Sequence, residues 1–594
     1  MAWLRVLTAL ALGAICSGAI IESIADLTKL KLKFDYIVVG GGTSGAVIGN
    51  RLTENKDVSV LIVEAGGSNA NVLDIIVPAF CTMATPQTPQ DWNYTTIPQP
   101  GLNGRAIAYP RGFVLGGSSS VNYLIYTRGA RDDFDRFARV TGDEGWSWDS
   151  LIPYILKNER FGLPADHHNT TNQFDPKVHG FNGINSVSLA GFPSDIDSRV
   201  FEATDELSEF PFNLDMNSGN TIGIGWMQAT IKDGSRSSSA TSYLAPEFVN
   251  RPNLHVLLNA RVTRVLPTGP TSFDTVEFVQ SLDGKLKMIR PRYTLTAGSE
   301  VILSAGSIGT PAILLHSGIG NSTTLSALGI EPLHNLPSVG QNLSDHVFLG
   351  ASWLVNSTNT TDEAARNATL AAEELAKWNT TRMGPLVDNP GSQLGWLRIP
   401  NNSSIFEQFS DPSAGPTAGH FELLLANGIV GPPPPTGNFM SISSALVSPT
   451  SRGYVELNST DPLAAPLINP NFLASDFDMF VLREALRASA RFAAAPVFSN
   501  YIIAPFSFNA TDTDPELDEF IRANAGTVFH PVGTAAMSAK GANFGVVDPD
   551  LTVKGLQKLR IVDLSVLPFI PASHTQASAY IIAERAADLI KAAQ

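Results

Sequence analysis

The stretch Phe34-Asp-Tyr-Ile-Val-Val-Gly-Gly-Gly-Thr-Ser-Gly45, continued by Ala46-Val-Ile-Gly-Asn-Arg-Leu52, decides the fold of this chain. A short apolar run with β-branched residues is followed by a glycine-rich turn and a helix-compatible segment, which predicts strand, turn and helix. Gly40 permits the tight turn, Gly42 lets a pyrophosphate approach the backbone, and Gly45 lets helix and strand pack closely. The phosphates would lie at the N-terminus of the helix, where free N–H groups favour anions.

A second predicted strand, Val58-Ser-Val-Leu-Ile-Val63, ends at Glu64. An acid roughly twenty residues after the glycines is placed to bind a ribose hydroxyl, and a carboxylate there favours an unphosphorylated ribose. The glycines alone could form a simple turn, but together with both strands, the helix and the acid they predict a dinucleotide site. The motif does not separate NAD from FAD. The irregular segment with Pro and Gly after Glu64 could cover an extended flavin.

Length and composition limit the class of protein. With 594 residues the chain exceeds what one hydrophobic core usually serves, so two domains are expected. An apolar fraction of 43% and a charged fraction of 16% describe a compact globular enzyme. The formal net charge of -15 leaves no surplus of cations for a phosphate backbone, so we expect no nucleic-acid partner.

The start of the chain resembles a secretion signal. After Met-Ala-Trp-Leu-Arg5 comes the apolar run Val6–Ile15, and small residues follow up to Ala19. This predicts a signal peptide over residues 1–19 and a secreted, extracellular protein. The run is shorter than the ~20 apolar residues of a membrane span, so no membrane anchor is expected. Cys81 would then be the only cysteine of the mature chain. Sequons agree with secretion; they include Asn93, Asn169, Asn321, Asn342, Asn356, Asn367, Asn379, Asn458 and Asn509.

Two longer stretches resemble the signatures of an enzyme family. Tyr109-Pro-Arg-Gly-Phe-Val-Leu-Gly-Gly-Ser-Ser-Ser-Val-Asn122 resembles the first signature of the glucose-methanol-choline (GMC) oxidoreductases. Gly306-Ser-Ile-Gly-Thr-Pro-Ala-Ile-Leu-Leu-His-Ser-Gly-Ile-Gly320 resembles the second. The resemblance extends from about Phe34 to the C-terminus. The segments most similar to fungal aryl-alcohol oxidases are Asp91-Trp-Asn-Tyr-Thr-Thr96, Phe529-His-Pro-Val-Gly533 and Val547-Asp-Pro-Asp-Leu551.

The resemblance implies a mixed α/β fold with two domains built from discontinuous segments. A Rossmann-like FAD-binding domain is expected from residues 34–112, 234–350 and 540–594. A substrate-binding domain with an antiparallel sheet and helices is expected from residues 113–233 and 351–539. A single-chain monomer is expected.

The resemblance also implies how FAD is held. Some relatives tether FAD covalently through a histidine in the loop where this chain has Val121 and Asn122, so we expect non-covalent binding. Read without the family, the loop could be a plain serine-rich turn and Val262 ordinary strand core. The cofactor contacts that the resemblance adds to Gly40, Gly42, Gly45 and Glu64 are Gly117, Ser118, Asn122, Val262 and Asp563.

Two of the ten histidines, His530 and His574, lie in segments that the family places over the flavin. Hydride removal from an alcohol carbon requires that the hydroxyl proton also leaves, and a neutral imidazole can accept it near neutral pH. We assign His530 as the base and His574 as the residue that orients the alcohol oxygen, with the reverse assignment left open. By itself, either histidine would more often be a core residue.

Other candidate residues concern metals and the substrate. His167, His168 and His179 lack the spacing of metal ligands and lie in a polar segment, so we expect surface histidines and no metal. By resemblance, the substrate contacts are the aromatic residues Tyr109 and Phe529 and the acidic Glu422. Val430 stands where known relatives carry a gate aromatic, and Pro432 to Pro435 predict a surface loop.

The expected activity is FAD-dependent oxidation of a primary alcohol, aromatic or allylic, to its aldehyde. A small-molecule alcohol and dioxygen would be the partners, and hydrogen peroxide the second product. Three alternatives stay open at this point: a dehydrogenase of the same family that uses quinone acceptors, a flavin-containing hydroxynitrile lyase, and a binding protein with a vestigial flavin.

Overall fold

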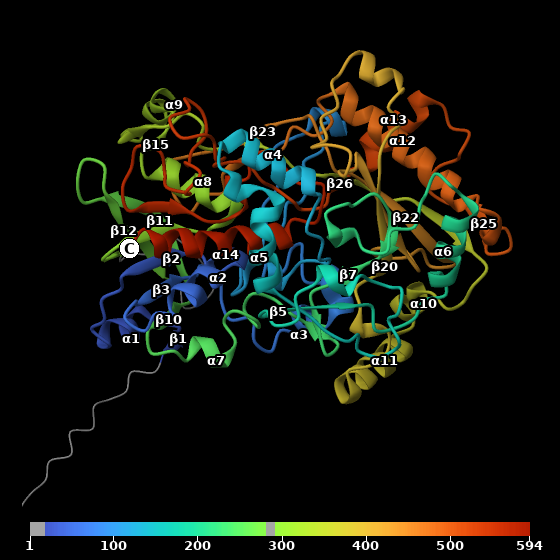
Figure 1. The fold of residues 1–594 in the computed structure, drawn as a ribbon, viewed down its shortest axis with the longest axis horizontal. Coiled ribbons are helices and arrows are strands. Elements are labelled where there is room, and N and C mark those ends of the chain that lie inside the picture. Colours follow the sequence, from blue (N-terminus) through green and yellow to red (C-terminus); the bar gives the residue numbers. More distant parts are fainter. Residues whose placement is uncertain (1–17, 281–291) are drawn as a thin grey trace, which may run out of the picture.

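A parallel β-sheet lies at the centre of one of the two parts of the molecule, on the left in Figure 1. The computed structural model describes residues 18–280 and 292–594. The six strands run in the order β1-β10-β3-β2-β14-β27, and every neighbouring pair is parallel. The strands are β1 (Ala19–Ile21), β2 (Tyr36–Val39), β3 (Val60–Val63), β10 (Leu254–Leu257), β14 (Glu300–Leu303) and β27 (Leu559–Ile561).

The central strands are apolar throughout because both faces of the sheet are covered. All four residues of β2 and of β3 are buried, as expected for a parallel sheet between two layers. Helix α2 (Thr43–Leu52) packs against β3 and against α14 (Gln576–Ala592), and Figure 1 shows these helices side by side. Helix α8 (Gly306–His316) packs against β11 (Ala260–Pro267).

The other part of the molecule, on the right in Figure 1, is built on a seven-stranded antiparallel sheet. Its order is β20-β21-β22-β18-β26, with β19 paired to β22 and to β25. Helix α12 (Asp476–Ala493) packs on β21 and β22, and α13 (Asp514–Asn524) packs on α12. The strands are β18 (Val347–Leu349), β19 (Ser352–Val355), β20 (Gly391–Leu397), β21 (Phe421–Ala426), β22 (Asn438–Leu446), β25 (Ile502–Pro505) and β26 (Gly526–Thr527).

Shorter elements connect and cover these sheets. The other helices are α1 (Ile24–Lys29), α3 (Leu73–Ile76), α4 (Arg131–Thr141), α5 (Trp148–Asn158), α6 (Asp197–Glu206), α7 (Pro246–Val249), α9 (Ser322–Ala327), α10 (Thr361–Arg366) and α11 (Ala368–Thr381). The other strands are β4 (Glu159–Phe161), β5 (Asn185–Leu189), β6 (Gly223–Trp226), β7 (Gln228–Ala229), β8 (Ile231–Lys232), β9 (Ser235–Arg236), β12 (Phe273–Gln280), β13 (Tyr293–Thr296), β15 (Ile319–Gly320), β16 (His334–Asn335), β17 (Gln341–Leu343), β23 (Gly453–Glu456) and β24 (Leu467–Asn469).

The predicted fold class is confirmed: the molecule combines a Rossmann-like sheet with a second, antiparallel domain. Strand pairing crosses the expected segment limits at several places, including these two. Strand β1 joins the parallel sheet although it precedes residue 34, and β18 joins the antiparallel sheet although it lies within 234–350. Of the predicted signal peptide, residues 1–17 lie outside the described residues, and Ala19 pairs with His255.

Helix α8 contains a proline within its length. It begins at Gly306 and contains Pro311, which has no N–H to bond the carbonyl of Ser307 one turn earlier. That carbonyl instead accepts a hydrogen bond of 2.7 Å from the Thr534 hydroxyl. The substitute partner explains how the helix tolerates an internal proline. Over residues 18–280 and 292–594 no helix has both the length and the apolarity needed to cross a membrane.

The expectation that His179 lies on the surface is wrong. Its side chain is fully buried and forms hydrogen bonds with Glu159 (Nδ1 to Oε1, 2.9 Å) and Asp215 (Nε2 to Oδ2, 2.7 Å). The guanidinium of Arg128 pairs with the other oxygen of Glu159 at 2.5 Å. Burial lowers the pKa of His179, but the two carboxylates raise it more, so the net shift is upward. His179 therefore carries its charge inside a neutralising network, which sequence polarity does not reveal.

This network predicts a stability that depends on pH. A histidine whose pKa is raised on folding stabilises fully below its unfolded pKa of about 6.5, and the contribution is lost as pH rises through the folded value. The urea midpoint should therefore fall from about pH 6.5 upward in the wild type, and this fall should disappear in His179→Asn. Because two buried carboxylates would lose their partner, His179→Asn should also lower the free energy of unfolding by about 3–5 kcal/mol.

The matched control is His167→Asn, in the same segment. His167 is exposed and has a left-handed backbone (φ 58°), which asparagine tolerates. Equal effects of the two substitutions would contradict the assigned role of His179.

Candidate active site

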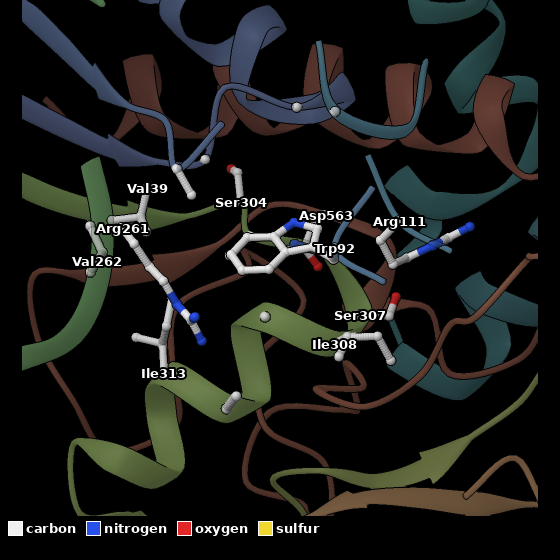
Figure 2. Close-up of a pocket in the computed structure, with 18 of the residues that line it drawn as sticks. Val39, Trp92, Arg111, Arg261, Val262, Ser304, Ser307, Ile308, Ile313 and Asp563 are labelled. Carbon is white, nitrogen blue, oxygen red and sulfur yellow. The ribbon is translucent and has the colours of Figure 1, made fainter. Parts of the chain in front are cut away.

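A cavity that is partly open to solvent lies at the carboxyl ends of the parallel strands (Figure 2). Ligands of open α/β sheets bind at this edge. Figure 2 shows Trp92 and Arg261 extending into the cavity, with the guanidinium carbon 5.0 Å from the Trp92 ring centroid. The predicted residues that line it are Gly40, Gly42, Glu64, Gly117, Ser118, Val262 and Asp563.

The glycines of the cavity are needed because backbone segments touch there. Gly40 has φ +101°, and a Cβ on Gly45 would lie 2.0 Å from the carbonyl oxygen of Gly40. Gly117 has φ +53°, and a Cβ on it would lie 2.8 Å from the Cα of Gly42. The glycine-rich turn and the loop of the first signature are therefore in direct contact, and neither accepts a side chain at these positions.

Two acidic residues in the cavity wall, Glu64 and Asp563, accept hydrogen bonds from the turns that surround the cavity. Glu64 accepts hydrogen bonds from the N–H groups of Gly41 (2.6 Å) and Gly66 (2.7 Å), and burial raises its pKa to about 7. Asp563 accepts from the N–H of Gly306 (2.9 Å) and the hydroxyl of Thr310 (2.6 Å), and so ties β27 to the start of α8. Both carboxylates line the cavity while they also shape the turns around it.

The cavity fits an extended dinucleotide such as FAD. Helices α2 and α8 both begin at it, and their N-cap residues, Gly42 and Ala305, supply no side-chain hydrogen bond to the first turn. Such helix ends favour phosphates. The hydroxyl of Ser304 is buried in the cavity wall and has no hydrogen-bond partner among the described residues. A Cβ on Gly306 would point into open space. These groups offer a nucleotide the free donors and the close backbone approach that it needs.

The predicted catalytic histidines lie together beside this cavity. The ring centroids of His530 and His574 are 4.9 Å apart, and the ring planes are nearly perpendicular at 87°. Pro531, the next residue after His530, lines the cavity. Nε2 of His574 lies 2.9 Å from Oε1 of Glu422, a residue of β21. The structure thus brings His530, His574 and Glu422 into one cluster, although they are far apart in the sequence.

The local backbone fixes the direction of His530. Phe529, half-buried, has a left-handed conformation with φ 64°, which is uncommon for a large side chain. Its carbonyl accepts a hydrogen bond of 2.6 Å from Arg111, and its N–H donates to the hydroxyl of Thr527 at 2.7 Å. These contacts hold a strained turn, as is common at functional sites.

Electrostatics keep His530 uncharged. Burial and then the nearby His574, His346 and Arg111 lower the pKa of His530 well below its usual value. At neutral pH the ring is therefore a neutral imidazole that can accept a proton.

The prediction that Tyr109 contacts substrate directly is not supported by its position. Tyr109 is only 1% exposed, and its hydroxyl donates to Asp345 at 2.6 Å. The same carboxylate accepts from Thr527 (2.7 Å) and from the main-chain N–H groups of His346 and His530 (2.8 Å each). Tyr109 therefore supports Asp345, which in turn supports His530.

Asn122 also lies outside the cavity lining, contrary to expectation. Its carbonyl oxygen accepts from Arg236 at 2.7 Å, and its amide donates to Gln576, the first residue of α14. Asn122 thus joins the signature loop to the helix that follows His574. Ala579, on the first turn of the same helix, lines the cavity.

Sequence reasoning missed Asp345, His346 and Arg111. His346 was one of ten histidines with no motif of its own, and no spacing connects residue 346 with residue 530. Among the described residues no group of His, Cys, Asp or Glu is arranged to hold a metal ion, and Cys81 is buried and free.

Comparison with known proteins identifies the family. Family models described as GMC oxidoreductase match residues 34–348 and 449–583, and the chain belongs to this family. It is an FAD-dependent oxidoreductase. The chain is 40% identical to "Dehydrogenase eriK" of Hericium erinaceus over 99% of this chain and 98% of that protein. It is also 40% identical to a pyranose dehydrogenase of Agaricus campestris, over 94% and 93%.

Two solved structures of oxidases also superpose closely on this chain. A formate oxidase of Aspergillus oryzae RIB40 superposes with a TM-score of 0.85 at 30% identity and covers 95% of this chain and 98% of its own. A fungal aryl-alcohol oxidase superposes with a TM-score of 0.81 at 26% identity, over 94% and 98%.

Proposed function

We propose that this protein oxidises the hydroxyl carbon of a small alcohol to a carbonyl at the His530 and His574 pair. The observation that carries the proposal is the perpendicular packing of the two rings, 4.9 Å apart, beside the dinucleotide cavity. FAD, when bound, supplies the acceptor for the hydride that leaves the alcohol carbon.

The side chains of His530 and His574 would bind the hydroxyl group of the alcohol and accept its proton. Nδ1 of His530 is engaged with His346, so Nε2 is the atom left to accept the hydroxyl proton. His574, held by Glu422, would orient the alcohol oxygen and stabilise developing negative charge on it. Both rings are less than a tenth exposed, which limits competition from water. The roles of the two histidines could be exchanged without changing the reaction class.

For the substrate we propose a primary alcohol with an aromatic or allylic group, and dioxygen as the final acceptor. Phe529 supports an aromatic substrate because it is adjacent to His530 and only half-buried. A second candidate is a dehydrogenase that oxidises sugars and passes electrons to a quinone. Both relatives at 40% identity are named dehydrogenases, and the name of the second, a pyranose dehydrogenase, favours a sugar substrate.

An anaerobic stopped-flow screen of alcohols tests the proposal. Mixing oxidised enzyme with benzylic alcohols should bleach the flavin absorbance, and no bleaching by any alcohol or sugar would contradict alcohol oxidation. Bleaching would also exclude a hydroxynitrile lyase, which performs no net redox step. Faster bleaching by pyranoses than by benzylic alcohols would favour the second candidate.

The electron acceptor is tested separately with air-saturated enzyme. Peroxide formation at the rate of alcohol consumption supports an oxidase. Reduction of a quinone dye with little peroxide supports a dehydrogenase.

We also propose that the protein is secreted as a monomer after removal of residues 1–19. The sequence of the N-terminal region supports secretion. N-terminal sequencing of protein from culture medium, with its mass in solution, tests both statements; a mature chain that retains Met1 would contradict the first.

A further inference from the structure

His346 meets His530 ring nitrogen to ring nitrogen. His346 directly precedes β18, and His530 follows β26, which pairs antiparallel with β18. The two Nδ1 atoms are 3.0 Å apart, and the ring planes cross at 80°. Oδ1 of Asp345 accepts the main-chain N–H of both histidines. The Asp345 carboxylate and the pairing of β18 with β26 therefore fix the backbone positions of both histidines.

Only one of these Nδ1 atoms can carry the shared proton. His346 is 1% exposed, and its Nε2 makes no hydrogen bond with any described residue. Burial, and then the nearby His574, lower the pKa of His346 to about 3, so its ring is a neutral imidazole with one proton. In the proposed reaction Nε2 of His530 must be free of a proton to accept one from the alcohol, so the single proton of its neutral ring is on Nδ1. Nδ1 of His346 is then the acceptor and Nδ1 of His530 the donor.

We propose that His346 is a positioning residue that holds the proton of His530 on Nδ1 and keeps Nε2 of His530 free for the substrate. The proposal rests on the proposed function, with His530 as the base. In that reaction the alcohol O–H bond breaks and its proton goes to Nε2 of His530, while the C–H bond breaks and its electron pair leaves with the hydride to FAD.

No other described group near His530 forms a hydrogen bond with its ring, so His346 is the residue that can fix the position of the ring proton. His574 packs against the His530 ring at 4.9 Å between centroids. Asp345 accepts the main-chain N–H of His530, not the ring, and Arg111 binds the carbonyl of Phe529. Of the described residues, His346 is the one that forms a hydrogen bond with the ring of His530. A change at His346 should therefore alter the tautomer of His530.

The tautomer is measurable without turnover. In oxidised holoenzyme carrying ¹⁵N-labelled histidine, long-range ¹H–¹⁵N correlation spectra distinguish a proton on Nδ1 from one on Nε2. The His530 signals are assigned by their loss in His530→Gln. A neutral ring with the proton on Nδ1 is expected. A proton on Nε2 in the wild type would overturn the proposal, because His346 would then be the donor.

Substitution at His346 gives a second, independent measurement. His346→Leu removes the acceptor and should lower the limiting rate of flavin reduction by roughly 10- to 100-fold, the effect of leaving one buried hydrogen bond unmade. The half-saturating alcohol concentration should stay nearly constant, because His346 does not touch substrate. His346→Asn keeps an acceptor near the position of Nδ1 and should restore most of the rate.

The control is His255→Leu, a buried histidine of β10 beside Phe34 that does not line the cavity. It should leave rate and tautomer unchanged. A His346→Leu enzyme with the wild-type rate and an unchanged His530 spectrum would refute the proposal. If instead His530→Ala fails to slow reduction, the proposed function fails, while the spectrum still reports whether His346 sets the tautomer.

Discussion

Replacing His530 with alanine should leave FAD bound and slow flavin reduction by alcohol at least ~100-fold, the usual contribution of a general base. The residue lies beside the cavity and does not line it, so the variant keeps every residue of the cavity lining. The rate falls because the variant lacks the imidazole assigned to accept the hydroxyl proton. Anaerobic stopped-flow measurement at the flavin absorbance gives the rate, and the ratio of flavin to protein absorbance gives the FAD content.

The pH dependence provides a check on the same residue. Because burial and the nearby His574, His346 and Arg111 hold the pKa of His530 well below its usual range, its base form persists throughout the neutral range. Wild-type reduction should therefore not decline between pH 8 and pH 6 through protonation of His530. The control His255→Ala should react like the wild type. A His530→Ala enzyme that is reduced at a near-normal rate would refute the assignment of the base.

Gly45→Ala should abolish FAD binding. The added Cβ would lie 2.0 Å from the carbonyl oxygen of Gly40, a distance that neither backbone can absorb without opening the turn. Alanine is favoured over glycine inside a helix by roughly 1 kcal/mol, so any loss must come from this contact and not from helix propensity. The flavin content of the purified variant should fall at least ~10-fold, because we expect the phosphates to bind where the turn and α2 meet.

The matched control is Gly350→Ala, where an added Cβ has no neighbour within 4 Å and φ is not positive. That variant should keep its flavin. Circular dichroism of Gly45→Ala separates loss of cofactor from loss of fold. A Gly45→Ala protein that retains flavin at the wild-type ratio would show that the turn is not the phosphate site.

Patterns within a short stretch of sequence predicted the dinucleotide-binding part of the molecule. Gly40, Gly42 and Glu64 line the cavity, as expected from a strand, turn and helix read within thirty residues. Periodicity and glycine spacing are properties of neighbouring residues, so a sequence displays them directly. Similarity of segments predicted the contacts of individual side chains less well. It assigned Tyr109 to the substrate and Asn122 to the cofactor, whereas the Tyr109 hydroxyl binds Asp345 and the Asn122 amide binds Gln576.

The sequence by itself determined that this chain folds around a dinucleotide cavity and belongs to the GMC oxidoreductases, and it singled out His530 and His574. Only the tertiary structure decided which groups act on those histidines. His346 and His530 are 184 positions apart and meet through the pairing of β18 with β26, and Glu422 reaches His574 from β21. The proton position and charge of an imidazole depend on what lies within about 3 Å of its ring. That neighbourhood is created by the fold and is absent from the order of the residues.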